Sequence, residues 1–566
     1  MAAQACSNRV KILVFLLGFV LYGTMPAPAL ARLLPSVKAR APMPEPKRPE
    51  GFPTDAELEN NQARIGTILF DERQLFDVEN QDEMTTLSKL ANKLHISTRE
   101  ATIEEQLLFK SGDLYRPGLL DESARILRNT RYLRDAFIRP VAYHDNLVDV
   151  EVTTQDVWTL NPGISFGRKG GKNTGGVEFE ELNFLGMGTA LGVSFTRSID
   201  RDSKSIFYRD RHLASSWWDL STEYSNNSDG RLVQFGLDHP FYAMDTRWAS
   251  GVSFVDDQRT DSRYDLGEII DQYLVHEKLS SIYWGWSDGL MGGWSRRYSV
   301  GLSYEDHQFD PTTGADPTIL LPADRKLVYP WMAVEWVQDE FRTVRNRNQI
   351  EKTEDYSLGW RARAQLGYAS TAVGSDRDAV MLLAGVTKGT EFGERQTVEF
   401  SSDFTGRLEQ GTLHGGILSA GARYYFRQSP RRLFFTELSA AAGHNLDLDQ
   451  QILLGGDSGL RGYPLRYQAG EGRWLFTAEQ RFFSNWYPFQ LFNVGGAVFY
   501  DMGATWGRDP LGAPSQGVLR DVGFGLRLGN SRSALGNVLH LDVAFPLDGD
   551  PSIKNVQFLV ETRKSF

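Results

Sequence analysis

Apolar and polar residues alternate strictly in many segments between positions 161 and 566, and this alternation constrains the fold more than any other feature of the chain. A period of two is typical of β-strands that have one apolar face and one polar face. Turn-forming residues separate the segments, for example at 226–230 and 310–322. The clearest alternating runs are 191–196, 298–305, 358–368 and 556–561.

Two architectures show such alternation: a soluble β-sandwich or propeller, and a membrane β-barrel. The inward face of the runs is polar and includes Arg361 and Arg363, which an apolar core would not hold unpaired. Aromatic pairs near the ends of runs, such as Trp217–Trp218, are typical of the interfacial girdles of barrels. At roughly 25 residues per strand, residues 161–566 are predicted to form a mainly β, transmembrane antiparallel barrel of about 16 strands.

The N-terminus is typical of a secretory signal peptide. Arg9 and Lys11 precede an apolar core over 12–22, and Ala29–Ala31 fits the small-residue cleavage rule. Residues 1–31 are therefore predicted to be removed, so that the chain functions outside the cytoplasm. The lone cysteine, Cys6, lies in this segment, which excludes a disulfide framework and a thiolate metal site within the chain.

Two further segments precede the barrel. Residues 32–61 are rich in proline and are predicted to form an extended linker. Residues 62–158 are predicted to be a mixed α/β domain. Its expected elements are a strand over 65–76, helices over 84–94 and 101–109, a helix that begins near Pro117, and a hairpin about Asp145–Asn146.

Composition and motifs do not indicate an enzyme. The chain carries 61 basic and 72 acidic residues, a net charge of -11, which argues against a nucleic-acid partner. Its nine histidines lack ligand-like spacing, and the glycine-rich run 170–176 lies between two strands without the helix that a phosphate loop needs. The acidic run 256–261 is expected to be a solvated loop. We predict no catalytic residues, no metal and no cofactor.

A glycine-rich loop near the C-terminus carries the best functional signal. Residues 455–463 contain Arg461, and the next two predicted strands contain Glu479 and Asp501. A guanidinium offers a planar donor fork to carboxylates, so this arginine can pin the loop to the barrel wall. Gly462 would let the loop tip turn closely. The alternative is a surface turn with a solvated arginine, which would contribute less than about 1 kcal/mol as an ion pair.

The segment Leu460-Arg461-Gly462-Tyr463 resembles the (V/I/L)-R-G-(F/Y) loop of the BamA/TamA outer-membrane assembly superfamily, also called the bacterial surface antigen family. Glu479 matches the acidic strand position of that superfamily, Asp501 matches its F-x-D-x-G strand, and 523–527 resembles the strand that follows. The resemblance implies that these residues anchor the loop in the barrel lumen.

An earlier segment, 181–188, resembles the E-x-N-x-x-G-x-G turn of the same superfamily through Asn183, Gly186 and Gly188. All of these motifs occur in the order typical of the family, over residues 161–566.

Residues 62–158 are similar to one polypeptide-transport-associated (POTRA) domain, chiefly over 107–115, 120–133 and 148–158. The resemblance implies a periplasmic domain that offers strand edges to client chains. A domain that only braces the barrel mouth is the alternative. The general insertase of the family has several such domains, and this chain has room for about one, which favours a specialised member.

The C-terminus resembles the sorting signal of outer-membrane barrels. The chain ends in Phe566, and Val560 and Phe558 are apolar at alternate positions before it. Thr562 and Lys564 interrupt the pattern.

The resemblance as a whole implies a monomeric barrel in the lipid of the bacterial outer membrane, with its POTRA-like domain in the periplasm. Such a protein would assemble, insert or translocate client proteins that it receives through residues 62–158. Two other functions are compatible with the sequence. One is a passive pore, which Arg361 and Arg363 would make selective for anions, and the other is a lipid-transfer or envelope-scaffold barrel.

Overall fold

The computed structural model describes most of the chain. The predicted signal peptide 1–31, most of the predicted helix over 84–94 and the terminal Phe566 lie outside the described residues, so they stay predictions. The described residues are 43, 48–76, 92–93, 95–313, 320–488, 491–507, 515, 517–530, 532–533, 538–549, 551 and 553–563.

The N-terminal unit (residues 48–158) is a small sheet covered by helices. Its three strands lie in the order β1–β3–β2, with β1 parallel and β2 antiparallel to β3. The predicted hairpin is present, because Asp145 and Asn146 form a tight turn with φ values of 49° and 61°. The elements are α2 (Asp55–Asn60), β1 (Arg64–Arg73), α4 (Glu100–Glu104), α5 (Pro117–Arg128), β2 (Leu133–His144) and β3 (Leu147–Asp156).

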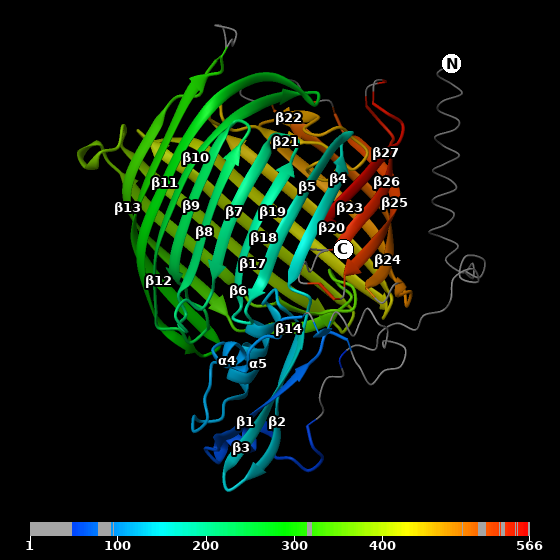
Figure 1. Cartoon of the computed structure of the whole chain (residues 1–566). Helices are drawn as coiled ribbons and strands as arrows, with labels where there is room; N and C mark the ends of the chain where they lie inside the picture. The colour runs from blue at the N-terminus through cyan, green and yellow to red at the C-terminus, as the bar shows by residue number, and fades with distance from the viewer. Residues whose placement is uncertain are drawn as a thin grey trace, which may run out of the picture.

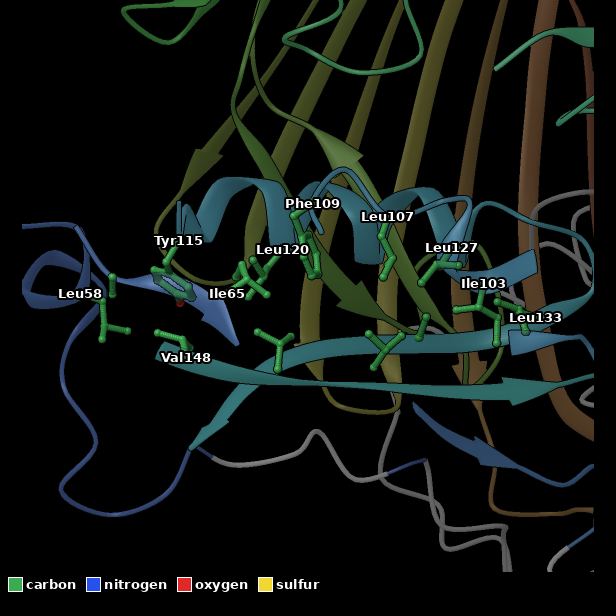
Figure 2. Packing of buried hydrophobic residues seen from close by; sticks show 14 of the residues in the cluster. Leu58, Ile65, Ile103, Leu107, Phe109, Tyr115, Leu120, Leu127, Leu133 and Val148 are labelled. Atoms are coloured by element: carbon green, nitrogen blue, oxygen red, sulfur yellow. The ribbon is translucent and has the colours of Figure 1, made fainter. Parts of the chain in front are cut away.

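One apolar core holds this unit together (Figure 2). Leu120 and Leu127 on one face of α5 pack over Val148 and other buried residues of the sheet. Leu58 of α2 belongs to the same core and is fully buried. Thr54 caps α2 in a reciprocal capping box. Residues 48–61 therefore belong to the N-terminal unit, which corrects the prediction that the linker extends to residue 61.

The remaining chain forms a closed antiparallel barrel of twenty strands among the described residues (Figure 1). The strands are β4 (Leu160–Lys169), β5 (Lys172–Phe184), β6 (Thr189–Arg197), β7 (Asp202–Asp210), β8 (Asp219–Asn227), β9 (Gly230–His239), β10 (Trp248–Asp265), β11 (Glu268–Met291), β12 (Trp294–Pro311), β13 (Arg325–Gln338), β16 (Arg361–Ala369), β17 (Ala379–Phe392), β18 (Gln396–Glu409), β19 (Thr412–Ser429), β20 (Arg432–His444), β23 (Gly472–Phe483), β24 (Phe492–Trp506), β25 (Leu519–Asn530), β26 (Val538–Pro546) and β27 (Gln557–Arg563).

The prediction of about 16 strands is wrong because it assumed connections that are too long. Several hairpins close through only two residues with positive φ, as at Gly170–Gly171, Leu266–Gly267 and Gln410–Gly411. Two-residue turns of this kind match the twist of antiparallel strands. They leave about 20 residues for each strand with its connection, so the same length of chain forms more strands.

The barrel is apolar outside and polar inside. On β16, the outward Leu366 and Tyr368 are exposed, whereas Arg361 donates to Glu335 at 2.8 Å and Arg363 donates to Asp403 at 2.7 Å. Exposed apolar side chains recur on the outer face of most other strands. An exposed apolar band of this extent is typical of a surface that meets lipid, so the barrel is an outer-membrane type of structure with a soluble N-terminal unit.

No helix among the described residues is long and apolar enough to cross a membrane.

The two ends of the barrel differ (Figure 1). We call the end that carries the N-terminal unit the near end and the opposite end the far end. A small hairpin of β14 (Phe341–Arg345) and β15 (Thr353–Ser357) lies at the near end, beside α5. A second short pair, β21 (Ile452–Leu454) and β22 (Gln468–Gly470), lies at the far end.

Candidate functional site

The loop that carries Arg461 folds back into the barrel from the far end. We call residues 445–471 the lumen loop. Its arms pair as β21 and β22, and its tip lies between them. Leu460 and Tyr463 are fully buried in an apolar cluster that also contains Leu519 of the barrel wall. This burial fixes the tip, because apolar contact removes it from the water of the lumen.

Arg461 contacts two acidic residues on neighbouring strands of the wall. Its Nε and Nη2 atoms donate to the two carboxylate oxygens of Asp501 at 2.7 and 2.8 Å, and its Nη1 donates to Glu479 at 2.7 Å. The exposed fractions of Arg461, Glu479 and Asp501 are 2%, 4% and 0%. The guanidinium carbon also lies 3.4 Å from the centre of the Phe499 ring. The structure thus brings together the three charged residues that the sequence singled out.

The two residues after Arg461 also contact the wall. The Gly462 N–H donates to a carboxylate oxygen of Asp521 at 3.0 Å, and the Tyr463 hydroxyl donates to the Arg520 carbonyl at 2.8 Å. A Cβ at Gly462 would lie only 2.6 Å from the Cβ of Asp521. Glycine at this position therefore permits the close approach of the loop to β25.

Several charged residues that the sequence motifs did not single out complete the cluster. Asp521, Asp542 and Arg527 are buried beside the site, and Arg527 pairs with Asp542. Arg481 donates to the second oxygen of Glu479 at 2.9 Å. Each of these residues has the same inward parity on its strand as Glu479 or Asp501, and this parity is the signal that could have identified them.

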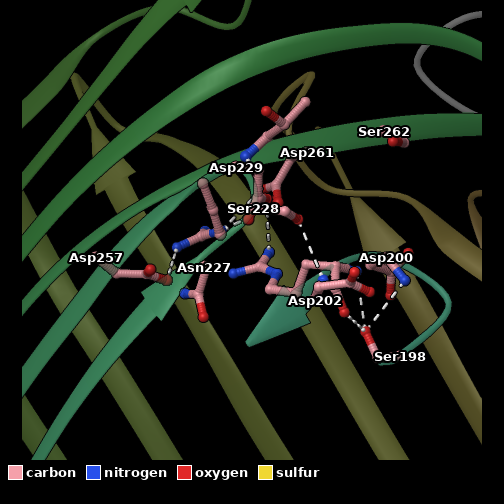
Figure 3. A network of polar contacts seen from close by, with 12 residues as sticks. Ser198, Asp200, Asp202, Asn227, Ser228, Asp229, Asp257, Asp261 and Ser262 are labelled. Atoms are coloured by element: carbon pink, nitrogen blue, oxygen red, sulfur yellow. Dashed lines mark hydrogen bonds and ion pairs between the residues drawn. The ribbon is translucent and has the colours of Figure 1, made fainter. Parts of the chain in front are cut away.

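At the far end, ion pairs hold the lumen loop to the strand ends. Arg466 pairs with Asp457 of the loop and, in bidentate fashion at 2.8 Å, with Asp200 of the β6–β7 turn. Asp200 lies in a polar network of turns and strand ends (Figure 3), in which Thr260 donates to Asp229 and Arg259 pairs with Asp257 and Asp261. The acidic run 256–261 thus contains ion-paired strand residues of β10 and not a loop, which corrects that prediction.

The early turn motif forms a seat for the N-terminal unit. The side-chain amide of Asn183 donates to the Thr98 hydroxyl at 2.9 Å, and the Oδ1 atom of the same amide accepts the Gly188 N–H at 2.7 Å. The Gly186 carbonyl accepts the Arg99 N–H at 3.0 Å. Gly186 and Gly188 have φ values of 76° and 70°, which favour glycine.

A second contact fixes α5 to the near end. Glu122 accepts the N–H of Met244, in the β9–β10 turn, at 2.9 Å. Burial raises the pKa of the Glu122 carboxyl, and this hydrogen bond opposes the rise. The N-terminal unit is therefore docked on at least two turns of the barrel.

The boundary between the first and last strands is weakly paired. Among the described residues, β4 and β27 share one register pair, Arg168 with Val560, and Lys169 adds an ion pair to Glu561 at 2.9 Å. Val560 and Phe558, from the predicted sorting signal, lie on the outward side of β27, where Phe558 is 58% exposed.

A cavity of about 480 Å³ lies in the lumen beside this boundary. Its lining includes Arg461 and Glu479 of the loop anchor and Lys169 and Glu561 of the boundary. The loop anchor and the boundary between the first and last strands therefore face one space.

The chain was compared with known families, sequences and structures. No family model matches the chain. A protein of Treponema pallidum (strain Nichols), described as an outer membrane protein assembly factor, is 28% identical over 168 residues. The match covers 27% of this chain and 20% of the relative, so the chain spans about a fifth of the length of that protein.

Solved structures with a similar fold include two types of outer-membrane barrel. CdiB from Acinetobacter baumannii is 14% identical, with a TM-score of 0.41, over 88% of this chain and 74% of that chain. BamA from Haemophilus ducreyi, in a form that lacks POTRA domains 1–3, is 13% identical, with a TM-score of 0.38, over 88% and 84%.

The sequence match to an assembly factor confirms the resemblance that the loop and strand motifs predicted, and the N-terminal sheet with its helices is POTRA-like. The chain is similar, over part of its length, to an outer membrane protein assembly factor.

Proposed function

We propose that this protein assembles or translocates client proteins at the bacterial outer membrane, with its near end toward the periplasm. The sequence similarity to an assembly factor, the apolar outer face of the barrel and the POTRA-like unit support this function. Client capture uses the sheet of the N-terminal unit, in which β2 is an end strand. An extended segment of a client can add to such an edge through main-chain hydrogen bonds.

The observation that carries the proposal is the weak boundary between β4 and β27. The adjacent β26–β27 boundary has seven register pairs, against one for β4–β27 among the described residues. Opening a strand boundary leaves backbone groups without hydrogen-bond partners in hydrocarbon, which is costly. Because β4 and β27 share fewer register pairs than β26 and β27, their boundary opens at a smaller cost. Once open, it offers two strand edges to a client strand.

The structure favours this function over an anion-selective pore. Arg361 and Arg363, which suggested anion preference, are both paired with acidic residues. The lumen loop also occupies part of the inside of the barrel, which narrows the space left for a passive pore.

A cross-link across the boundary tests the proposal. Arg168→Cys combined with Val560→Cys joins the directly paired positions, whose Cβ atoms are close enough for a disulfide after a small shift. The purified variant is placed in lipid vesicles, and a urea-unfolded eight-stranded outer-membrane barrel is added as the client. We expect oxidation to slow client folding to the rate in empty vesicles, and reduction to restore it.

The matched control is Ser402→Cys with Ala420→Cys, a register pair in the β18–β19 boundary, which has thirteen register pairs. Oxidation of the control should leave client folding unchanged. If the locked boundary folds the client as fast as the reduced one, the boundary is not the insertion site and the proposed mechanism is wrong. A large steady conductance in a planar bilayer would instead favour the pore.

A further inference from the structure

The β14–β15 hairpin is a second element that enters the barrel, from the end opposite to the lumen loop. It connects β13 to β16, and Figure 1 places β14 at the near end, beside α5. Its tip, residues 346–352, contacts the inner wall of the barrel between β18 and β24.

Apolar packing anchors the tip. Ile350 is buried in a cluster with Tyr425, Leu433, Phe435 and Phe483 of β19, β20 and β23. A Cβ at Gly529 of β25 would lie 3.2 Å from the Cβ of Ile350, so the wall leaves room for this side chain. Burial of an isoleucine contributes about 1.5–3 kcal/mol.

Polar contacts fix the tip at the same place. The Arg347 guanidinium lies between the rings of Tyr356 and Tyr425, at 4.0 and 3.9 Å from their centres, and pairs with Glu399 of β18. Asn493 of β24 donates to the Ile350 carbonyl at 3.2 Å. The tip therefore contacts β18, β19 and β24 directly.

The tip keeps its shape through a buried acid. Glu354 accepts the N–H groups of Arg347, Asn348 and Gln349 at 3.0 to 3.1 Å. Asn346 exchanges two hydrogen bonds with Glu351, both of 2.8 Å. The tip is therefore an ordered element that can move as one piece.

The hairpin is clamped to the N-terminal unit along β15 and at its tip. Arg128, at the end of α5, forms two hydrogen bonds of 2.7 Å with Asp355, and both side chains are 8% exposed. Thr353 donates to Asp135 of β2 at 2.7 Å, and Arg134 donates to the Glu351 carbonyl at 2.7 Å.

The hairpin also reaches the anchor of the lumen loop. Arg481 donates to the Arg347 carbonyl at 3.0 Å and, through its Nε, to Glu479. Glu479 accepts from Arg461 with its other oxygen. One chain of charge-assisted hydrogen bonds thus leads from the hairpin tip to the loop tip.

We propose that the β14–β15 hairpin is a plug that closes the barrel from the near end, and that the docked N-terminal unit holds it in place through the Arg128–Asp355 clamp. Movement of the N-terminal unit away from the barrel, as on binding a partner, releases the hairpin and opens the lumen. This inference does not depend on the proposed client, because closure is a property of the barrel itself.

The first test is the planar-bilayer conductance of the full chain. Asp355→Ala leaves Arg128 buried without its partner, which should raise the open fraction on the order of 100-fold. Replacement of residues 346–352 by two glycines should give a steadily open barrel. Arg342→Ala on the same hairpin is the matched control, because the Arg342 side chain that pairs with Glu391 of β17 is 55% exposed, and this variant should stay closed.

The second test separates release of the plug from general damage. Ile350→Cys with Gly529→Cys, in the Asp355→Ala background, allows a disulfide to tie the tip to the wall. Oxidation should close the leaky barrel again and reduction should reopen it, while heat-dependent gel mobility checks that the barrel is folded. If the folded variant without residues 346–352 conducts no more than the natural chain, or if oxidation does not restore closure, the hairpin is not a plug.

Discussion

At the scale of single residues, glycines decide where the N-terminal unit meets the barrel. Gly188 has a φ of 70°, and a Cβ there would lie 2.9 Å from the Tyr132 hydroxyl oxygen. Gly171 has a φ of 83° and open space where its Cβ would be. A non-glycine residue would therefore strain the backbone at either position. Only at position 188 would its Cβ also clash with the docked unit.

We expect Gly188→Ala to loosen docking and Gly171→Ala to leave it unchanged. The left-handed backbone destabilises both variants by about 1–2 kcal/mol. Only Gly188→Ala also displaces Tyr132. Hydrogen exchange of residues 95–132 measures the docking. Equal exchange in the two variants would show that the turn motif does not seat the N-terminal unit.

The charged residues of the loop anchor could be predicted only in part. Arg461, Glu479 and Asp501 were found because each lies in a short motif that resembles the superfamily. Arg481 and Asp521 lie on strands that carry a motif but were not matched to it themselves, and Asp542 lies on β26, which carries none. Their proximity to Arg461 depends on the register of four neighbouring strands. Alternation shows which face a residue occupies, but it does not fix the register between strands.

At the scale of secondary-structure elements, the sequence predicted the strands, the hairpin at Asp145–Asn146 and the start of α5 at Pro117, because each has a strong local signal. It missed the β14–β15 hairpin. Residues 339–357 carry no alternation that singles them out, and only tertiary contacts show that they leave the barrel wall. The predicted number of strands was wrong because it depends on the length of the turns, which alternation does not reveal.

The helix α2 was also missed, since nearby prolines indicated a linker. Leu58→Ala tests its place in the N-terminal unit. We expect a loss of about 2–5 kcal/mol in the stability of that unit, because the side chain is fully buried. Urea unfolding followed by hydrogen exchange of β1 and β3 measures it. Leu69→Ala on β1, where the side chain is 47% exposed, is the control and should cost much less.

At the scale of the whole molecule, two elements enter the barrel from opposite ends and meet at one carboxylate. The lumen loop reaches Glu479 through Arg461, and the β14–β15 hairpin reaches it through Arg481. The cavity beside them extends to the boundary between β4 and β27. The occupied lumen and the weakly paired boundary are therefore close enough to influence each other.

The central claim is that Arg461, held by acidic residues of the wall, keeps the lumen loop inside a membrane barrel. A double-mutant cycle in lipid vesicles tests it most directly, with Arg461→Ala, Asp501→Ala and the double variant compared by urea unfolding. Arg461→Ala alone should cost about 3–5 kcal/mol, since it leaves the fully buried Asp501 without its guanidinium partner. The account predicts a coupling energy of about 1–3 kcal/mol between the two positions, and additive effects of the two substitutions would contradict it.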